Sequence, residues 1–254
     1  MKVAFKSDVG QVRSHNEDNG GFTHNKDGIL LAVVADGMGG HQAGDVASKM
    51  TIELLSSKWQ EAKGVTTPTS IELWLEQSIT EINAHLFEHS LKHPQCQGMG
   101  TTLVAVVCTS QFVTYAHIGD SRAYLLNGNV FEQKTEDHTL VNELVRSGQI
   151  TLLEAENHPR RNVILRALGT ERTIKVDIKT IEWDEGSFIL LCSDGLSNKI
   201  KDEEMFEVLK KDTSLEEKVV DLINDANERG GEDNISVALV FNSDQENRGD
   251  GDDR

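Results

Sequence analysis

Residues 101–134 read TTLVAVVCTSQFVTYAHIGDSRAYLLNGNVFEQK, and this stretch decides the fold class. Three apolar runs follow one another with only short polar segments between them: 101–108, 112–118 and 122–126. Asn127-Gly128 then supplies the residues of a tight hairpin turn. A parallel sheet of βαβ units needs a helix after nearly every strand, and this stretch has none. It therefore predicts a meander of antiparallel strands.

The flanking segments add more strands and two pairs of helices. Strand-like runs are found at 2–8, 28–35, 174–181, 188–192 and 235–241. Apolar residues at helical spacing predict helices at about 42–63, 70–93, 202–211 and 215–229. We expect an α+β fold, a four-layer α-β-β-α sandwich in which two stacked, mainly antiparallel sheets are flanked by helix pairs.

The chain is expected to form a single domain over residues 1–242. No proline- or serine-rich linker divides its 254 residues, and a layered fold of this size is often one domain. Residues 243–254 are acidic and lack apolar side chains, which predicts a disordered tail.

Charge and cysteine content limit the partners and the compartment. A formal net charge of -17 repels phosphate backbones and anionic membranes, so we expect no nucleic-acid partner. No apolar run approaches membrane-spanning length and the N-terminus lacks a signal peptide, so we expect no membrane insertion. Three widely spaced cysteines, Cys96, Cys108 and Cys192, are typical of reduced core residues in a cytoplasmic protein.

Four acidic segments interrupt the apolar pattern, each beside a strand-like run: 13–18, 36–40, 193–195 and 232–234. A fold that brings these strand ends together gathers carboxylates, which repel one another unless protons or hard divalent cations neutralise them. Oxygen ligands without histidine or thiolate favour magnesium or manganese over zinc. Two such ions, roughly 3.5 to 4 Å apart in typical sites, lower the pKa of a bridging water and suit hydrolysis at phosphorus. Arg13 is placed to clamp the phosphate.

Six ordered motifs resemble those of the metal-dependent protein phosphatases, the PPM or type-2C serine/threonine phosphatases. They are Arg13-x-x-Asn16-Glu17-Asp18, Asp36-Gly37-Met38-Gly39-Gly40-His41, Gly98-Met99-Gly100-Thr101-Thr102, Gly119-Asp120-Ser121-Arg122, Ser193-Asp194-Gly195-Leu196 and Asp233-Asn234. The resemblance spans residues 1 to about 242, and it is to the compact bacterial members that counter eukaryotic-type serine/threonine kinases.

The resemblance implies two or three Mn²⁺ or Mg²⁺ ions and a role for each acid. Asp36 would bridge two ions, with Glu17 and the Gly37 carbonyl on one and Asp194 and Asp233 on the other. A metal-bridging hydroxide would attack the phosphoserine or phosphothreonine. The remaining roles would be a third metal site at Asp120, water orientation by Asp18 and phosphate binding by Arg13. Residues of about 140–170 would form a mobile flap beside the site.

The proton donor for the leaving alkoxide stays open at this point. Animal relatives have a histidine directly after the Asp-Gly pair, where this chain has Met38. His41 is close in sequence and is a candidate catalytic residue, together with Arg13 and Asp18. Metal-bound water is the other candidate.

The implied function is hydrolysis of phosphoserine and phosphothreonine in proteins. The resemblance suggests phosphorylated proteins as partners, a cognate serine/threonine kinase among them, and a monomer. Two alternatives remain. One is a catalytically inactive relative that binds partners, although the chain keeps every acid named above. The other is a two-metal hydrolase of nucleic acid or small phosphoesters, which the negative charge disfavours.

Overall fold

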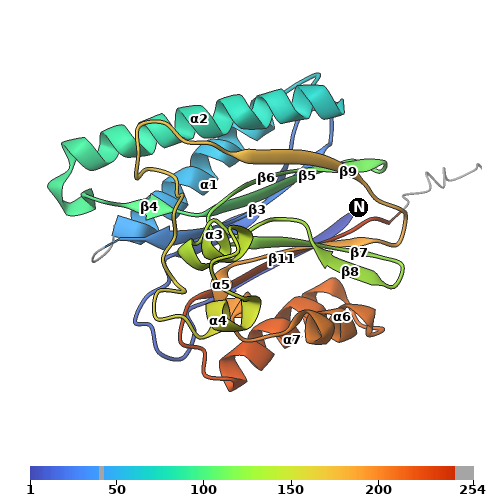
Figure 1. The fold of residues 1–254 in the computed structure, drawn as a ribbon. Helices are drawn as coiled ribbons and strands as arrows, with labels where there is room; N and C mark the ends of the chain where they lie inside the picture. The colour runs from blue at the N-terminus through green and yellow to red at the C-terminus, as the bar shows by residue number, and fades with distance from the viewer. Residues whose placement is uncertain (40–42, 244–254) are drawn as a thin grey trace, which may run out of the picture.

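The structure is a computed structural model that describes residues 1–39 and 43–243. Two antiparallel sheets are stacked face to face (Figure 1). The first runs in the order β1 (Lys2–Asp8), β11 (Ile235–Phe241), β10 (Phe188–Cys192), β7 (Arg122–Asn127) and β8 (Val130–Gln133). The second runs in the order β2 (Asp18–His24), β3 (Leu30–Met38), β5 (Leu103–Cys108), β6 (Phe112–Ile118) and β9 (Asp177–Glu182), with β4 (Gly100–Thr101) beside β3.

Helix pairs cover the two outer faces of the stacked sheets (Figure 1). α1 (Ala43–Glu61) and α2 (Pro68–Lys92) pack on the second sheet through a cluster that includes Trp59, Leu75 and Val33. α6 (Asp202–Lys210) and α7 (Leu215–Glu228) pack on the first sheet through a cluster that includes Leu222 and Leu190. The predicted α-β-β-α sandwich is therefore confirmed.

Strand β3 explains how one apolar run serves two cores. Leu31 and Val33 belong to the cluster under α1 and α2, whereas Leu30, Ala32 and Val34 belong to the cluster between the sheets. Successive side chains of a strand point to opposite faces, so a strand buried on both faces must be apolar throughout. The three cysteines are buried and free of disulfides, as their spacing predicted.

Strand β2 was missed by the sequence patterns. Its sequence, DNGGFTH, carries two glycines, and its one large apolar side chain, Phe22, is exposed. The strand forms because its whole length pairs with β3. A β-carbon at Gly20 would lie 2.5 Å from the Phe5 ring, so this glycine admits the close packing of β1 on β2.

The segment between β8 and β9 has little regular structure. It holds the short helices α3 (Leu140–Arg146) and α4 (Leu152–Glu156), and the chain then returns irregularly to β9. The remaining short elements are the 3₁₀ helix η1 (Pro94–Cys96) and α5 (Asp194–Ser197). Of the helices in the described ranges, none is long and apolar enough to cross a bilayer. The tail predicted for 243–254 lies, apart from Ser243, outside the described residues.

Candidate active site

Strand register brings the acidic segments to one edge of the sandwich. Asp18 at the start of β2 is opposite Asp36 near the end of β3. In the other sheet, Cys192 at the end of β10 pairs with Val237 of β11 on one side and with Arg122 of β7 on the other. The residues just beyond these strand ends, which include Asp120, Asp194 and Asp233, therefore gather at the same edge.

The backbone of Glu17 ties three of the acidic segments together. Its N–H donates to Asn234 Oδ1 at 2.7 Å, and its carbonyl accepts from the Gly37 N–H at 3.2 Å and from Ser48 Oγ at 2.6 Å. Asn234 in turn donates from Nδ2 to the carbonyls of Val9 and His15. The first, second and fourth segments are thus tied to one another by hydrogen bonds.

Two glycines allow the close approach of helix α1 to this edge. A β-carbon at Gly37 would lie 2.2 Å from the Gly44 carbonyl oxygen and 2.6 Å from that of Glu17. A β-carbon at Gly44 would lie 3.0 Å from Cδ of the Glu17 carboxyl group. Any larger residue at either position has to displace backbone, so the first turn of α1 reaches Glu17 only because both are glycine.

Asp36 is held by two threonines of the β4–β5 segment. Its N–H donates to Thr102 Oγ1 at 2.9 Å, and its carbonyl accepts from the Thr102 N–H at 2.8 Å and from Thr101 Oγ1 at 2.9 Å. Thr102 Oγ1 also shares a 2.7 Å hydrogen bond with Ser121 Oγ, beside Asp120. The threonine pair therefore connects Asp36 to the turn that carries Asp120.

Asp18, Asp194 and Asp233 also have defined polar partners. Asp18 is buried and accepts from Ser193 Oγ at 2.7 Å, and Ser193 Oγ accepts from the Ser236 N–H. Asp194 accepts from Asn198 Nδ2 at 3.0 Å. Asp233 accepts from the Asn234 N–H at 2.9 Å and forms a 2.8 Å ion pair with Arg13, in which both side chains are partly exposed.

Comparison with known proteins identifies the family. The family model described as Protein phosphatase 2C matches residues 10–235. The chain belongs to the protein phosphatase 2C family. The serine/threonine phosphatase stp of Listeria monocytogenes serotype 4b (strain F2365) is 48% identical over 240 residues, which cover 94% of this chain and 95% of that protein.

Solved structures of phosphatases share the fold of this family member. The S. agalactiae serine/threonine phosphatase superposes with a TM-score of 0.90 at 39% identity, covering 94% of this chain and 98% of that one. The catalytic domain of the serine/threonine protein phosphatase PstP, solved in complex with two manganese ions, superposes with a TM-score of 0.81 at 34% identity, covering 94% and 96% of the two chains.

Electrostatics shows how strongly the acids of this phosphatase 2C chain act on one another. Burial and then the Asp194 charge raise the pKa of Asp120 to about 8. Burial raises the pKa of Asp18 to about 7 against the opposing effect of its serine hydrogen bonds, and burial with the Asp233 charge raises that of Asp194 to about 6. The pKa of Asp36 lies well above its ordinary value, because of burial and then the Asp18 and Asp194 charges. The cluster favours proton uptake unless another cation neutralises it.

The donor set of this edge fits hard divalent cations. Within the described residues, four buried carboxylate oxygens have no hydrogen-bond partner: Glu17 Oε1, Asp18 Oδ1, Asp120 Oδ1 and Asp194 Oδ1. Buried polar atoms are nearly always paired, and carboxylate oxygens are the ligands that Mn²⁺ and Mg²⁺ prefer. No three His, Cys, Asp or Glu groups within 1–39 and 43–243 form a closed cage as the side chains stand. Asp233 is turned to Arg13 and Asp194 to Asn198, so the backbone gathers the acids without closing them around one point.

Most of the predicted site residues lie together at this phosphatase edge. The structure gathers Arg13, Glu17, Asp18, Asp36, Gly37, Asp120, Asp194 and Asp233 there. His41 lies outside the described residues. The supporting residues Asn234, Thr102 and Ser193 belong to the sequence motifs, but the sequence predicts no role for them. Their short polar side chains beside an acidic residue were the available signal, because such side chains hydrogen-bond neighbouring backbone.

Proposed function

We propose that this chain is a metal-dependent protein phosphatase that hydrolyses phosphoserine and phosphothreonine in proteins. The observation that carries the proposal is the set of partnerless buried carboxylate oxygens. They lie in a chain of the protein phosphatase 2C family that is 48% identical to a serine/threonine phosphatase. Two or three Mn²⁺ or Mg²⁺ ions are the cofactors we assign, supported by the two manganese ions in the PstP structure.

The residues assigned to the cations are Glu17, Asp36, Asp194, Asp233 and the Gly37 carbonyl, with Asp120 beside Asp194 for a third ion. When bound, such cations generate a nucleophile from water near neutral pH and neutralise charge on the phosphoryl group. Asp18 lies opposite Asp36 in the antiparallel β2–β3 pair. We assign it to orienting water through Oδ1, which has no hydrogen-bond partner among the described residues.

Arg13 is assigned to the phosphate. Its guanidinium pairs with Asp233 at 2.8 Å, and both side chains are about two-fifths to one-half exposed. An ion pair as exposed as this contributes about 0–1 kcal/mol. Arg13 can therefore leave Asp233 for a phosphate oxygen pair at little cost, and the fork of the guanidinium suits bidentate binding.

The leaving serine or threonine alkoxide needs a proton. His41 remains the candidate side chain for this role, and water held by the acids is the other. We further propose that residues 1–242 are one catalytic domain in which about 140–170 acts as a mobile flap. A cognate kinase among the substrates, a monomeric state and a cytoplasmic location complete the proposal.

Phosphate release from a phosphothreonine peptide tests the proposed function. We expect hydrolysis with Mn²⁺, none after chelation, and full recovery when Mn²⁺ is restored. A phosphotyrosine version of the peptide and an oligonucleotide serve as matched substrates that should react far more slowly. Activity that survives chelation contradicts the metal site, and absence of hydrolysis with any divalent ion favours the inactive, partner-binding alternative.

A further inference from the structure

His138 connects three parts of the structure that are far apart in the sequence. Its backbone N–H donates to the Gly119 carbonyl at 2.7 Å, and its own carbonyl accepts from the Leu165 N–H at 2.7 Å. Its ring lies between Gly119 and Asp177: the Gly119 N–H donates to Nδ1 at 3.1 Å, and Nε2 lies 3.0 Å from Asp177 Oδ2. The residue is buried, with 8% of its surface exposed.

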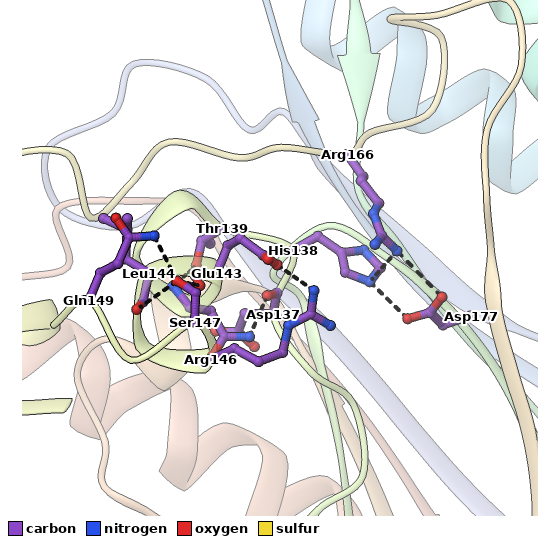
Figure 2. A network of polar contacts seen from close by, with 11 residues as sticks. Asp137, His138, Thr139, Glu143, Leu144, Arg146, Ser147, Gln149, Arg166 and Asp177 are labelled. Atoms are coloured by element: carbon purple, nitrogen blue, oxygen red, sulfur yellow. Dashed lines mark hydrogen bonds and ion pairs between the residues drawn. The ribbon is translucent and has the colours of Figure 1, made fainter. Parts of the chain in front are cut away.

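The hydrogen bond from Gly119 determines which ring nitrogen of His138 carries the proton. A backbone N–H can only donate, so Nδ1 must offer its lone pair, and the proton of the neutral ring lies on Nε2. Nε2–H then donates to the Asp177 carboxylate. Arg166 Nη1 is 3.2 Å from Nε2 and 3.4 Å from Asp177 Oδ1 (Figure 2), and because Nε2 has no free lone pair, Arg166 interacts with Asp177.

The ring of His138 is held in one plane. The His117 ring packs against it with a centroid separation of 4.6 Å. Asp177 is itself fixed on β9, opposite His117 of β6. Both hydrogen-bond partners of the His138 ring, and the His117 ring that packs against it, therefore lie in the second sheet or in the turn that follows β6. These contacts give the ring one orientation.

Gly119 transmits this orientation to Asp120. The glycine has a φ of +106°, and a β-carbon there would lie 2.6 Å from the Thr102 side chain, so the turn has no room to shift toward β5. The next residue, Asp120, is buried, and its Oδ1 has no hydrogen-bond partner in the part of the chain that the structure describes. Its charge contributes to the raised pKa of Asp36, and the Asp194 charge contributes to the raised pKa of Asp120 itself.

We propose that His138 is a positioning residue that holds Asp120 in place for divalent-cation binding, through the hydrogen bond from the Gly119 N–H to Nδ1. This inference rests on the proposed function, because it assumes that Asp120 helps to hold a cation. The Leu165 N–H bond places the same residue at the return of the 140–170 segment, so the Asp120 turn and that segment share one anchor.

Two substitutions separate the two ring bonds. In His138→Asn the side-chain oxygen takes the place of Nδ1 and can still accept from Gly119, but the donor to Asp177 is lost. In His138→Gln the terminal amide reaches the place of Nε2 and can still donate to Asp177, but the acceptor for Gly119 is lost. Mn²⁺ binding is measured by calorimetry without substrate, with Asp120→Asn as the reference.

The Asp120→Asn reference identifies the Mn²⁺-binding step to which Asp120 contributes. We expect His138→Gln to weaken the Mn²⁺ affinity of that same step by about tenfold or more, as for other residues that orient a metal ligand. His138→Asn should stay close to the unsubstituted protein. Equal loss in both variants, or wild-type Mn²⁺ binding by His138→Gln, overturns the inference. Absence of Mn²⁺ binding by the unsubstituted protein contradicts the proposed function instead, which keeps the two failures distinct.

Asp177→Ala provides the test if a His138 variant does not fold. The charged partner of Asp177, Arg166, is 37% exposed in its side chain, so the loss of Asp177 leaves no buried orphan charge. Without this acceptor the ring proton is free to move to Nδ1, where it opposes the Gly119 N–H. The same Mn²⁺ step should weaken, whereas the matched change Glu182→Ala, at an exposed position of β9, should leave it unchanged.

Discussion

Replacing Asp36 with Asn is expected to reduce phosphopeptide hydrolysis by about 10³-fold at saturating Mn²⁺. Charge stabilisation by a bound cation is worth several kcal/mol in the transition state, and each 1.36 kcal/mol is a factor of ten in rate. Asn has the shape of Asp but neither its charge nor its ability to bridge two cations. Asp212→Asn, at an exposed position between α6 and α7, is the matched control and should keep full activity.

The same substitution should make the metal-free protein more stable. Asp36 is half-buried near Asp18 and Asp194, and desolvation and these charges hold its pKa well above the ordinary value of an aspartate. A neutral isostere removes the cost of ionising this group, so it should raise the free energy of unfolding near pH 7.5. Saturating Mn²⁺ should reverse the order, because only the unsubstituted site gains from binding. Undiminished hydrolysis by Asp36→Asn would exclude Asp36 from the catalytic site.

The metal-free protein should lose stability as the pH rises from 6.5 to 8.5. Asp18 and Asp120 have folded-state pKa values of about 7 and about 8, raised first by burial. The unfolded chain releases these protons near pH 4. Across this window the folded state therefore holds protons that the unfolded state lacks, and stability falls by about 1.4 kcal/mol per pH unit for each such proton.

The pH window begins at 6.5 because, below that value, other groups make the free energy of unfolding rise with pH. Burial lowers the pKa of His117 to about 4, so this group makes stability rise with pH only up to about 6.5, where the unfolded histidine has also lost its proton. Glu204 is the usual carboxylate case: its Arg229 partner lowers its pKa to about 2, and its contribution is lost only in acid. Urea unfolding in chelator at several pH values measures the slope, and saturating Mn²⁺ should remove the part contributed by Asp18 and Asp120, because the ions bind the ionised carboxylates. Stability that rises with pH in chelator would contradict a buried acidic cluster.

The apolar runs in the sequence predicted both the antiparallel sheets and the acidic edge. The uninterrupted strands of 101–134 indicated antiparallel sheets, and the doubly buried strand β3 appeared as a continuous apolar run. Each acidic segment followed or preceded such a run, so their meeting at one edge required only that the strands pair in the observed order. Asp120 came from the motif resemblance alone, because a single acid in a turn has no pattern of its own.

The features that the sequence did not reveal depend on tertiary contacts. Strand β2 has no apolar alternation and exists because β3 offers it hydrogen bonds. His138 had no special context, and its bonds to Gly119 and Asp177 join residues that are distant in the chain. The Arg13–Asp233 pair likewise joins the two ends of the fold. Local propensity carries no information about such pairs.

Anomalous difference density from a crystal grown with Mn²⁺ tests the central claim most directly. We predict manganese peaks between Asp36 and its neighbours Glu17, Asp194 and Asp233, with Asp233 turned away from Arg13. Crystals of Asp36→Asn grown in the same way should lose the manganese peak that lies beside Asp36 in the unsubstituted protein. Manganese density that is absent from this edge, or found only at surface carboxylates, would contradict the assignment of these acids to a catalytic metal centre.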